Sequence, residues 1–132
     1  MSEQEEANRM FSVNPTDVAE LIRDKIAGLD QERPRLFDTS QSKAQAISDY
    51  DRAIALVVLK LKNGTIKEFE GEPINGLAVT LIPLIAKGIC WKECFTKEAE
   101  ENGYKAVISN IEVLKSQMNG LQSINKYLDN LK

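Results

Sequence analysis

The chain has 132 residues and a formal net charge of −3 at pH 7, with 17 basic and 20 acidic side chains. Its apolar fraction of 42% and charged fraction of 28% are those of an ordinary soluble domain, and its interspersed charges disfavour a nucleic-acid-binding stripe. Because the sequence contains no histidine, it lacks the side chain most used for acid–base catalysis and metal binding, so we expect neither an enzyme nor a cofactor.

The first thirteen residues are polar and acidic. They lack the basic start and apolar run of a signal peptide, so we expect a disordered tail on a cytoplasmic protein. The most apolar stretch, Leu77 to Trp91, is too short for a bilayer span and is interrupted by Pro83 and Lys87. Residues 14–132 are predicted to form one helical domain without a membrane span.

A first helix is predicted to begin at Asn14. The Asn14 side chain can cap the helix, Pro15 suits the first helical position, and the acid at Asp17 is favourable in the first turn. We expect this helix to end near Ala27, because Gly28 is a common residue just after a helix. Its predicted buried face comprises Val18, Leu21, Ile22 and Ile26.

A linker is predicted from Leu29 to Ser40, because Pro34 disfavours a helix there. A second helix should then run from Lys43 to Lys62. Its apolar residues fall on a helical seam formed by Ile47, Tyr50, Ile54, Val57 and Leu61.

The end of this second helix has an alternative interpretation, since Asn63-Gly64 between apolar runs is also a hairpin signal. A two-residue turn there would place Lys60 opposite Lys67, which is an unfavourable cross-strand pair. We therefore favour a helix that ends at Asn63-Gly64. A short extended arm, or a short hairpin, should follow around residues 65–71.

The stretch from Leu77 to Lys132 is predicted to be one long helix or a helix folded once on itself. A continuous helix would be about 80 Å long, whereas Lys43 to Lys62 could cover only about 30 Å of it. Either the long helix meets another copy of the chain or it breaks. Its seam, which is the predicted oligomer interface, comprises Val107, Ile111, Leu114, Met118, Leu121, Ile124 and Leu128.

The predicted break or kink lies at Asn102-Gly103, because Trp91, Phe95 and Ala99 occupy nearly the opposite face from Val107. Two faces indicate either a turn or two partners. Gly120 should stay inside the helix, since the seam continues across it, at a cost of about 1 kcal/mol. The predicted fold class is therefore all-α, an elongated helical bundle with a long C-terminal helix.

Candidate binding residues are few. The nearby aromatic and basic side chains Trp91, Lys92, Phe95 and Tyr104 could frame a pocket in which a base stacks on a ring and lysine meets phosphate. A lone tryptophan in an apolar helix is, however, more often part of a core or a subunit interface. Cys90 and Cys94 share a helical face, but two thiols do not complete a zinc site, so no metal is expected.

Three segments carry a resemblance to a known group of proteins: "DRAIALVVLKLKNG", "TLIPLIAKGICWKE" and "NGLQSINKYLD". From Tyr50 to Leu128 the chain resembles small helical proteins encoded by early genes of phages and prophages of Gram-positive bacteria. The sequence departs from that pattern mainly at Pro83. The resemblance implies a phage protein in the cytoplasm of an infected cell, and it transfers no functional residue.

Three functions agree with these observations. We favour a non-enzymatic homo-oligomer that binds a protein partner, such as a host defence or replication factor or another phage early protein. The alternative is an anti-defence protein that sequesters a nucleotide immune signal between subunits. A second alternative is an accessory to phage DNA recombination or replication, although no basic groove is visible in the sequence, so nucleic acid is an improbable ligand.

Overall fold

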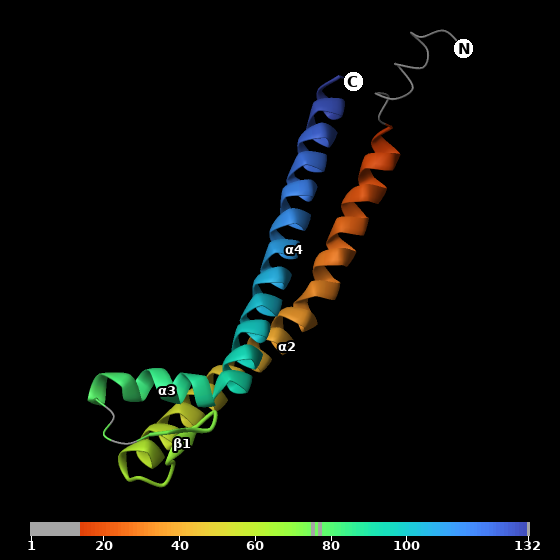
Figure 1. The fold of residues 1–132 in the computed structure, drawn as a ribbon. Coiled ribbons are helices and arrows are strands. Elements are labelled where there is room, and N and C mark those ends of the chain that lie inside the picture. The colour runs from red at the N-terminus through yellow and green to blue at the C-terminus, as the bar shows by residue number, and fades with distance from the viewer. Residues whose placement is uncertain (1–13, 75, 77, 132) are drawn as a thin grey trace. The chain divides into compact units, whose positions relative to one another are not determined.

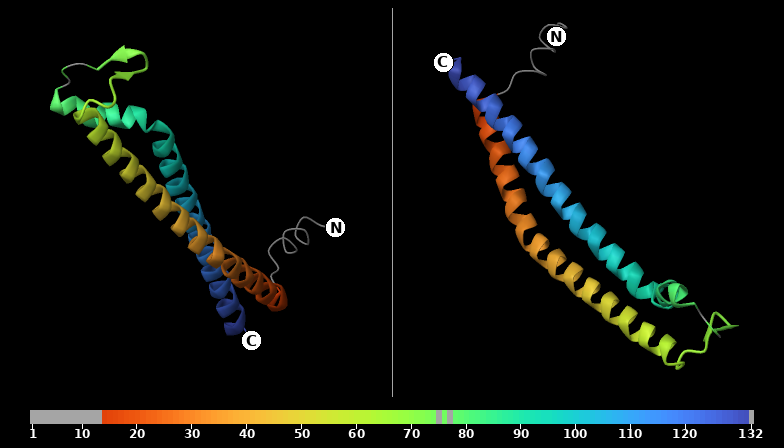
Figure 2. Two further views of the ribbon diagram at one scale, coloured as in Figure 1. Left: turned by 90° about the horizontal axis from the view of Figure 1, so that it is seen from below. Right: turned by 90° about the vertical axis from the view of Figure 1, so that its left-hand side faces the viewer.

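The computed structural model describes residues 14–74, 76 and 78–131, and these residues form an all-α fold with a long C-terminal helix, as predicted. The helices are α2 (Pro15–Lys62), α3 (Ile82–Ile89) and α4 (Trp91–Asn130), and a single 3-10 turn, η1 (Val79–Leu81), precedes α3. Figures 1 and 2 show α2 and α4 each as one unbroken ribbon. The predicted disordered tail, residues 1–13, lies outside the described residues.

Helix α2 begins as predicted. The backbone N–H of Thr16 donates a hydrogen bond of 2.9 Å to the side-chain oxygen of Asn14, which therefore caps the helix. Val18 is fully buried, as its predicted face requires. Leu21 and Ile26 are 45% and 46% exposed, so the buried face is narrower than predicted.

The predicted end at Gly28 and the predicted linker are both wrong, because α2 continues to Lys62 with Pro34 inside it. A proline within a helix removes one hydrogen bond and costs about 3 kcal/mol or more. The exposed Pro34 is tolerated because the helix keeps a buried or half-buried side chain at three- and four-residue steps on both sides of it. These side chains include Leu29, Glu32 and Leu36.

The end of α2 and the arm that follows agree with the predictions. The backbone N–H of Asn63 donates to the carbonyl of Leu59, and Gly64 adopts the left-handed conformation with φ of 78°. The arm is a short antiparallel hairpin of β1 (Glu68–Phe69) and β2 (Glu72–Pro73). It extends two residues beyond the predicted arm and turns through Glu70 and Gly71, which both have positive φ.

The last helical segment breaks at a different place from the one predicted. The chain leaves helical geometry at Cys90, between α3 and α4. Helix α4 then continues through Asn102-Gly103, so the predicted break there is wrong. Gly120 lies inside α4, as predicted.

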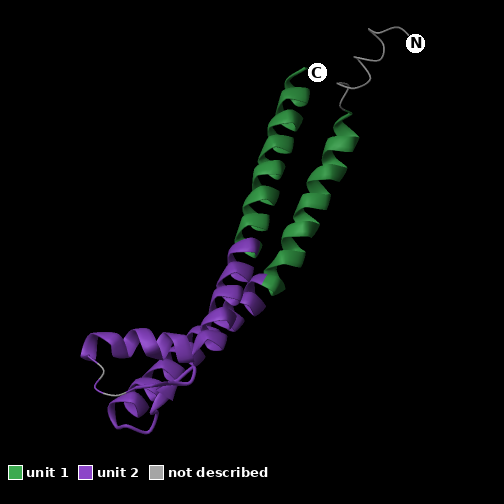
Figure 3. Ribbon diagram, in the orientation of Figure 1, with its two compact units in different colours: residues 1–35, 107–132 green, residues 36–106 purple. Residues whose placement is uncertain are grey.

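The chain divides into two compact units, shown in Figure 3. Unit 1 comprises residues 1–35 and 107–132, so its described helical parts are the beginning of α2 and the end of α4. The Leu114 side chain lies against Gly28, so these helices pack on each other within the chain. Val107, at the start of the predicted seam, is only 2% exposed. The seam of α4 therefore packs against α2 of the same chain at Gly28. Because the predicted first helix ends at that residue, the sequence did not indicate α2 as a partner.

Unit 2 comprises residues 36–106 and contains the remaining parts of α2 and α4, the hairpin, η1 and α3. Two reciprocal contacts join its long helices. The ammonium of Lys43 on α2 lies 4.5 Å from the ring centre of Tyr104 on α4, and Lys97 on α4 lies 5.0 Å from the ring centre of Tyr50 on α2. Because the pairs advance in opposite directions along the sequence, these helices are antiparallel.

The core of unit 2 extends from this pair of helices to α3. Its most buried apolar residues are Ala46, Tyr50, Ile82, Ala86 and Cys90. The ring of Phe69, from the hairpin, lies directly over Gly88 of α3. The hairpin is therefore held against α3 by side-chain packing. The division into two compact units does not test whether residues 14–132 form a single domain, so that statement stays a prediction.

Candidate functional site

The four predicted ligand-binding residues lie in unit 2, and the structure brings two of them together. The ammonium of Lys92 lies 5.6 Å from the ring centre of Trp91, whose side chain is 58% exposed. Phe95 is 70% exposed. Tyr104 is half-buried, and its ring lies against Lys43 of α2. Tyr104 therefore contributes to the pairing of α2 and α4.

Trp91, Phe95 and Ala99 form one exposed line along α4, which we call the Phe95 stripe. The neighbouring helical face carries Lys97 and half-buried Cys94 toward α2. The two faces predicted for this helix are therefore present. Because the helix does not turn back at Asn102-Gly103, the described part of unit 2 leaves the Phe95 stripe uncovered.

A second apolar feature surrounds the start of α3. A hollow of about 600 Å³, which we call the α3 hollow, opens between the hairpin and α3. Val79 and Leu84 are exposed on the same short segment. The hollow is lined mainly by apolar side chains, with two carboxylates beside them: Phe69, Glu70, Glu72, Pro73, Ile74, Gly76, Ala78, Leu81 and Ile85.

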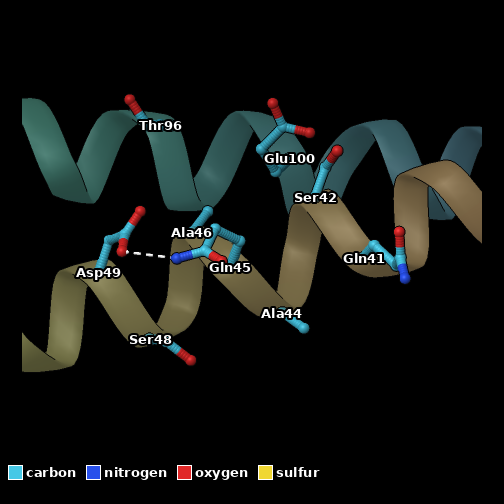
Figure 4. A pocket seen from close by; sticks show the side chains of 9 residues that line it. All are labelled: Gln41, Ser42, Ala44, Gln45, Ala46, Ser48, Asp49, Thr96 and Glu100. Atoms are coloured by element: carbon cyan, nitrogen blue, oxygen red, sulfur yellow. Dashed lines mark hydrogen bonds between the residues drawn. The ribbon is translucent and has the colours of Figure 1, made fainter.

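Unit 2 also carries a polar, open groove of about 720 Å³, shown in Figure 4. It lies along the paired helices, and the side-chain amide of Gln45 donates a 2.9 Å hydrogen bond to Asp49 within it. Its lining consists of Gln41, Ser42, Ala44, Gln45, Ala46, Ser48, Asp49, Thr96 and Glu100. Two carboxylates and no basic side chain line the groove, so it is a poor match for a phosphate group.

Two free thiols lie beside Tyr50 in the core of unit 2. Burial raises the pKa of the Tyr50 hydroxyl above its ordinary value, and the neighbouring Cys94 raises it further. Burial, with a smaller effect from Glu93, also raises the pKa of the Cys90 thiol. Raised thiol pKa values oppose thiolate formation, so Cys90 is suited to packing rather than to nucleophilic chemistry.

Metal binding has no support in the described part of the chain, where no cluster of three or more cysteine, aspartate or glutamate side chains could hold an ion. Likewise, none of the described helices is long and apolar enough to cross a bilayer.

Comparison of the chain with family models, curated proteins and solved structures gave no match.

Sequence reasoning did not identify the α3 hollow or the burial of Glu32 in unit 1. Glu32 is 8% exposed, and its Oε1 accepts a 2.7 Å hydrogen bond from Arg35. Its other carboxylate oxygen has no hydrogen-bond partner among the described residues. The three- and four-residue spacing of Leu29, Glu32 and Leu36 could have indicated this position, but a charged residue on the seam concealed it.

Proposed function

We propose that this chain is a non-enzymatic helical protein that self-associates and binds a protein partner. The observation that supports partner binding best is the α3 hollow, because an apolar depression next to exposed Val79 and Leu84 can receive an apolar side chain from another protein. Glu70 and Glu72 border the hollow, so a partner segment that combines an apolar anchor with basic neighbours would be complementary.

The resemblance to phage early-gene proteins suggests which partners to test first. A host defence factor, a host replication factor or another phage early protein would be present in an infected cytoplasm. Binding such a protein needs a surface and no reacting group. This agrees with the lack of histidine in the sequence.

Affinity capture from infected cells would test partner binding. The bait would be the full chain, compared with Leu81→Asp in the hollow and with Leu59→Asp as a matched control. Leu81 is 45% exposed and Leu59 is 61% exposed, so neither charge is forced into a core. We expect a stoichiometric partner that Leu59→Asp retains and Leu81→Asp loses. Capture of the same proteins by all three baits would contradict the role of the hollow.

A second candidate, the sequestering of a nucleotide signal, is favoured by one observation, the exposed Trp91 ring with Lys92 beside it. An aromatic face next to an ammonium can stack on a base and attract phosphate. Because Trp91 is the only tryptophan in the sequence, its fluorescence reports on this place directly. A panel of cyclic and ADP-ribose-type nucleotides should change the emission; no change with any of them would count against this candidate.

A further inference from the structure

We infer that a second copy of the chain fills the α3 hollow, and that it does so with the exposed leucines near the end of its α2 helix. This surface, which we call the Leu59 face, comprises Leu56, Leu59, Lys60 and Lys62. The inference rests on the self-association part of the proposed function and assigns it two complementary surfaces. Both surfaces lie in unit 2.

The Leu59 face is apolar at its centre and basic at its end. Leu56 and Leu59 are 46% and 61% exposed, and they are neighbours on the helix surface because they are three residues apart. Lys60 follows Leu56 by four residues and Lys62 follows Leu59 by three, so the lysines lie beside the leucines in the last turn of α2. The face therefore presents two apolar anchors with two ammonium groups next to them.

The α3 hollow has the opposite charge beside a similar apolar surface. Phe69 and Glu72 are partners in the register of the hairpin, so their side chains share one face of it. Because Phe69 packs on α3, this shared face also places Glu72 beside the hollow, together with Glu70. The volume of about 600 Å³ lies within the range of about 300–1,000 Å³ found for binding pockets.

The charges of the two surfaces are segregated along the sequence and are uncompensated. From Arg52 to Lys67 the chain has four basic and no acidic side chains, and from Glu68 to Ala78 it has three acidic and no basic ones. In the part of the chain that the structure describes, the two lysines of the face and the two glutamates of the hollow form no ion pairs. Opposite charge favours their pairing, and burial of the apolar groups adds to it.

A second copy is the occupant because one chain leaves both surfaces open. Leu59 stays 61% exposed and the hollow remains accessible. In the proposed contact the leucines of one copy lie against Leu81 and Ile85 of the other, and the lysine end of the face lies over the hairpin. The contact joins two different surfaces, so association either closes into a ring or a reciprocal pair or continues to larger species.

The contact also regulates partner binding, because a hollow that holds a second copy cannot receive another protein. A standard stable interface buries about 800 Å² on each partner, more than two leucines and two lysines supply. The dissociation constant should therefore be on the order of micromolar or above, and dilution should free the hollow. Leu59→Asp leaves the hollow intact, so capture of a partner by this variant is the expected result here as well.

Sedimentation velocity of the full chain, from a few micromolar to several hundred micromolar, would test the inference. We expect concentration-dependent association that Leu59→Asp and Leu81→Asp each weaken by on the order of tenfold or more. The matched control is Phe37→Asp, because Phe37 is an equally exposed apolar residue of α2, at 62%. Circular dichroism would confirm that each variant keeps its helices.

Mixing the two variants tests whether the face of one copy meets the hollow of another. The Leu81→Asp chain keeps an intact face, and the Leu59→Asp chain keeps an intact hollow. An equimolar mixture should therefore form a one-to-one dimer at concentrations at which each variant alone is monomeric. A mixture that associates no more than its components would overturn the pairing of these two surfaces.

A charge exchange tests the ion pairs. Lys60→Glu/Lys62→Glu should weaken association, and adding Glu70→Lys/Glu72→Lys in the same chain should restore it. Lys105→Glu/Lys115→Glu is the matched control, because it changes the net charge equally at two exposed lysines of α4. Failure of the four-residue exchange to restore association would contradict the assignment of the glutamates to the lysines.

The outcomes separate this inference from the proposed function. A wild-type chain that remains monomeric at every concentration would overturn both the inference and the self-association part of the proposal. Association that Leu59→Asp or Leu81→Asp leaves unchanged would overturn the inference alone. Equal weakening by Phe37→Asp would also contradict it.

Discussion

Replacing the helical glycines of α4 by alanine should stabilise the protein. Gly103 and Gly120 both lie within α4, and apart from the neighbouring residues and backbone of α4 itself, a methyl group added at either position would meet no atom of the described residues within 4 Å. Neither residue has positive φ, so alanine can adopt the same backbone conformation. Each substitution removes the entropic cost of a glycine in a helix, about 0.5–1 kcal/mol.

The double variant Gly103→Ala/Gly120→Ala should therefore gain about 1–2 kcal/mol in unfolding free energy. The entropy of unfolding of a globular chain is about 2.1 cal/mol/K per residue, so for this length the gain corresponds to a rise in Tm of roughly 4–7 °C. Thermal unfolding followed by circular dichroism would measure it, at one fixed protein concentration because any association between chains would make Tm concentration-dependent.

Gly88 of α3 provides the opposite case. A methyl group there would lie 2.9 Å from the end of the Phe69 ring, too close for the ring to remain in place. Overpacking of this kind costs about 1–3 kcal/mol, enough to offset or exceed the gain in helix propensity. Gly88→Ala should thus fail to stabilise, and Phe69→Leu in the same chain should restore part of the loss.

Two results would refute this reasoning. An unchanged Tm for the double variant would mean that α4 is not helical at these glycines in solution. A rise for Gly88→Ala equal to that for Gly103→Ala would mean that Phe69 does not pack over α3.

Three further predictions concern other parts of the chain. Pro34→Ala restores a backbone donor inside α2 and should raise the unfolding free energy by up to about 3 kcal/mol, measured by urea denaturation. Removing the cation–π contact with Tyr104→Leu and Lys43→Met, singly and together, should show a coupling of about 0.5–1 kcal/mol in a double-mutant cycle; additive effects would contradict the contact. Burial raises the pKa of the Cys90 thiol, so at a pH above the ordinary thiol pKa of 9.0 this group ionises in the unfolded chain while it stays protonated in the folded protein. The unfolding free energy should therefore fall as the pH rises past 9.0. Alkylation of the folded protein, followed by mass spectrometry, should modify the half-buried Cys94 before the buried Cys90.

The sequence predicted the elements whose signals are local. The cap at Asn14, the end of α2 at Asn63-Gly64 and the short arm after it depend on a few adjacent residues, and all three are present. The helical nature of α4 followed from its long apolar seam. These features do not depend on contacts with distant parts of the chain.

The errors arose where packing outweighs a local preference. Pro34 and Gly103 each disfavour a helix by an amount of order 1–3 kcal/mol, and packing along a long helix can offset this cost. The part of the α2 seam near Pro34 includes Glu32, Thr39 and Lys43, so its periodicity is invisible to a search for apolar residues. The break at Cys90 had no sequence signal, since no proline or glycine occupies that position.

The candidate binding surfaces were only partly predictable. Periodicity indicated that Trp91, Phe95 and Ala99 share a face, and the structure shows that this shared face is exposed. The α3 hollow could not be predicted, because it depends on how the hairpin places Phe69 against α3. That placement is a tertiary contact between segments with no common sequence pattern.

The division of the chain has a consequence for the order in which it folds. Unit 2 is one continuous stretch of sequence, whereas unit 1 is assembled from the two ends of the chain. Contacts in unit 1, such as that between Gly28 and Leu114, require a long loop to close, and the entropy of this closure is lost before any packing is gained. Formation of unit 2 first would shorten that loop, so the pairing of α2 and α4 should begin near the hairpin and advance toward the termini. The ends would then be the last region to form and the first to open, and amide hydrogen exchange should be fastest there.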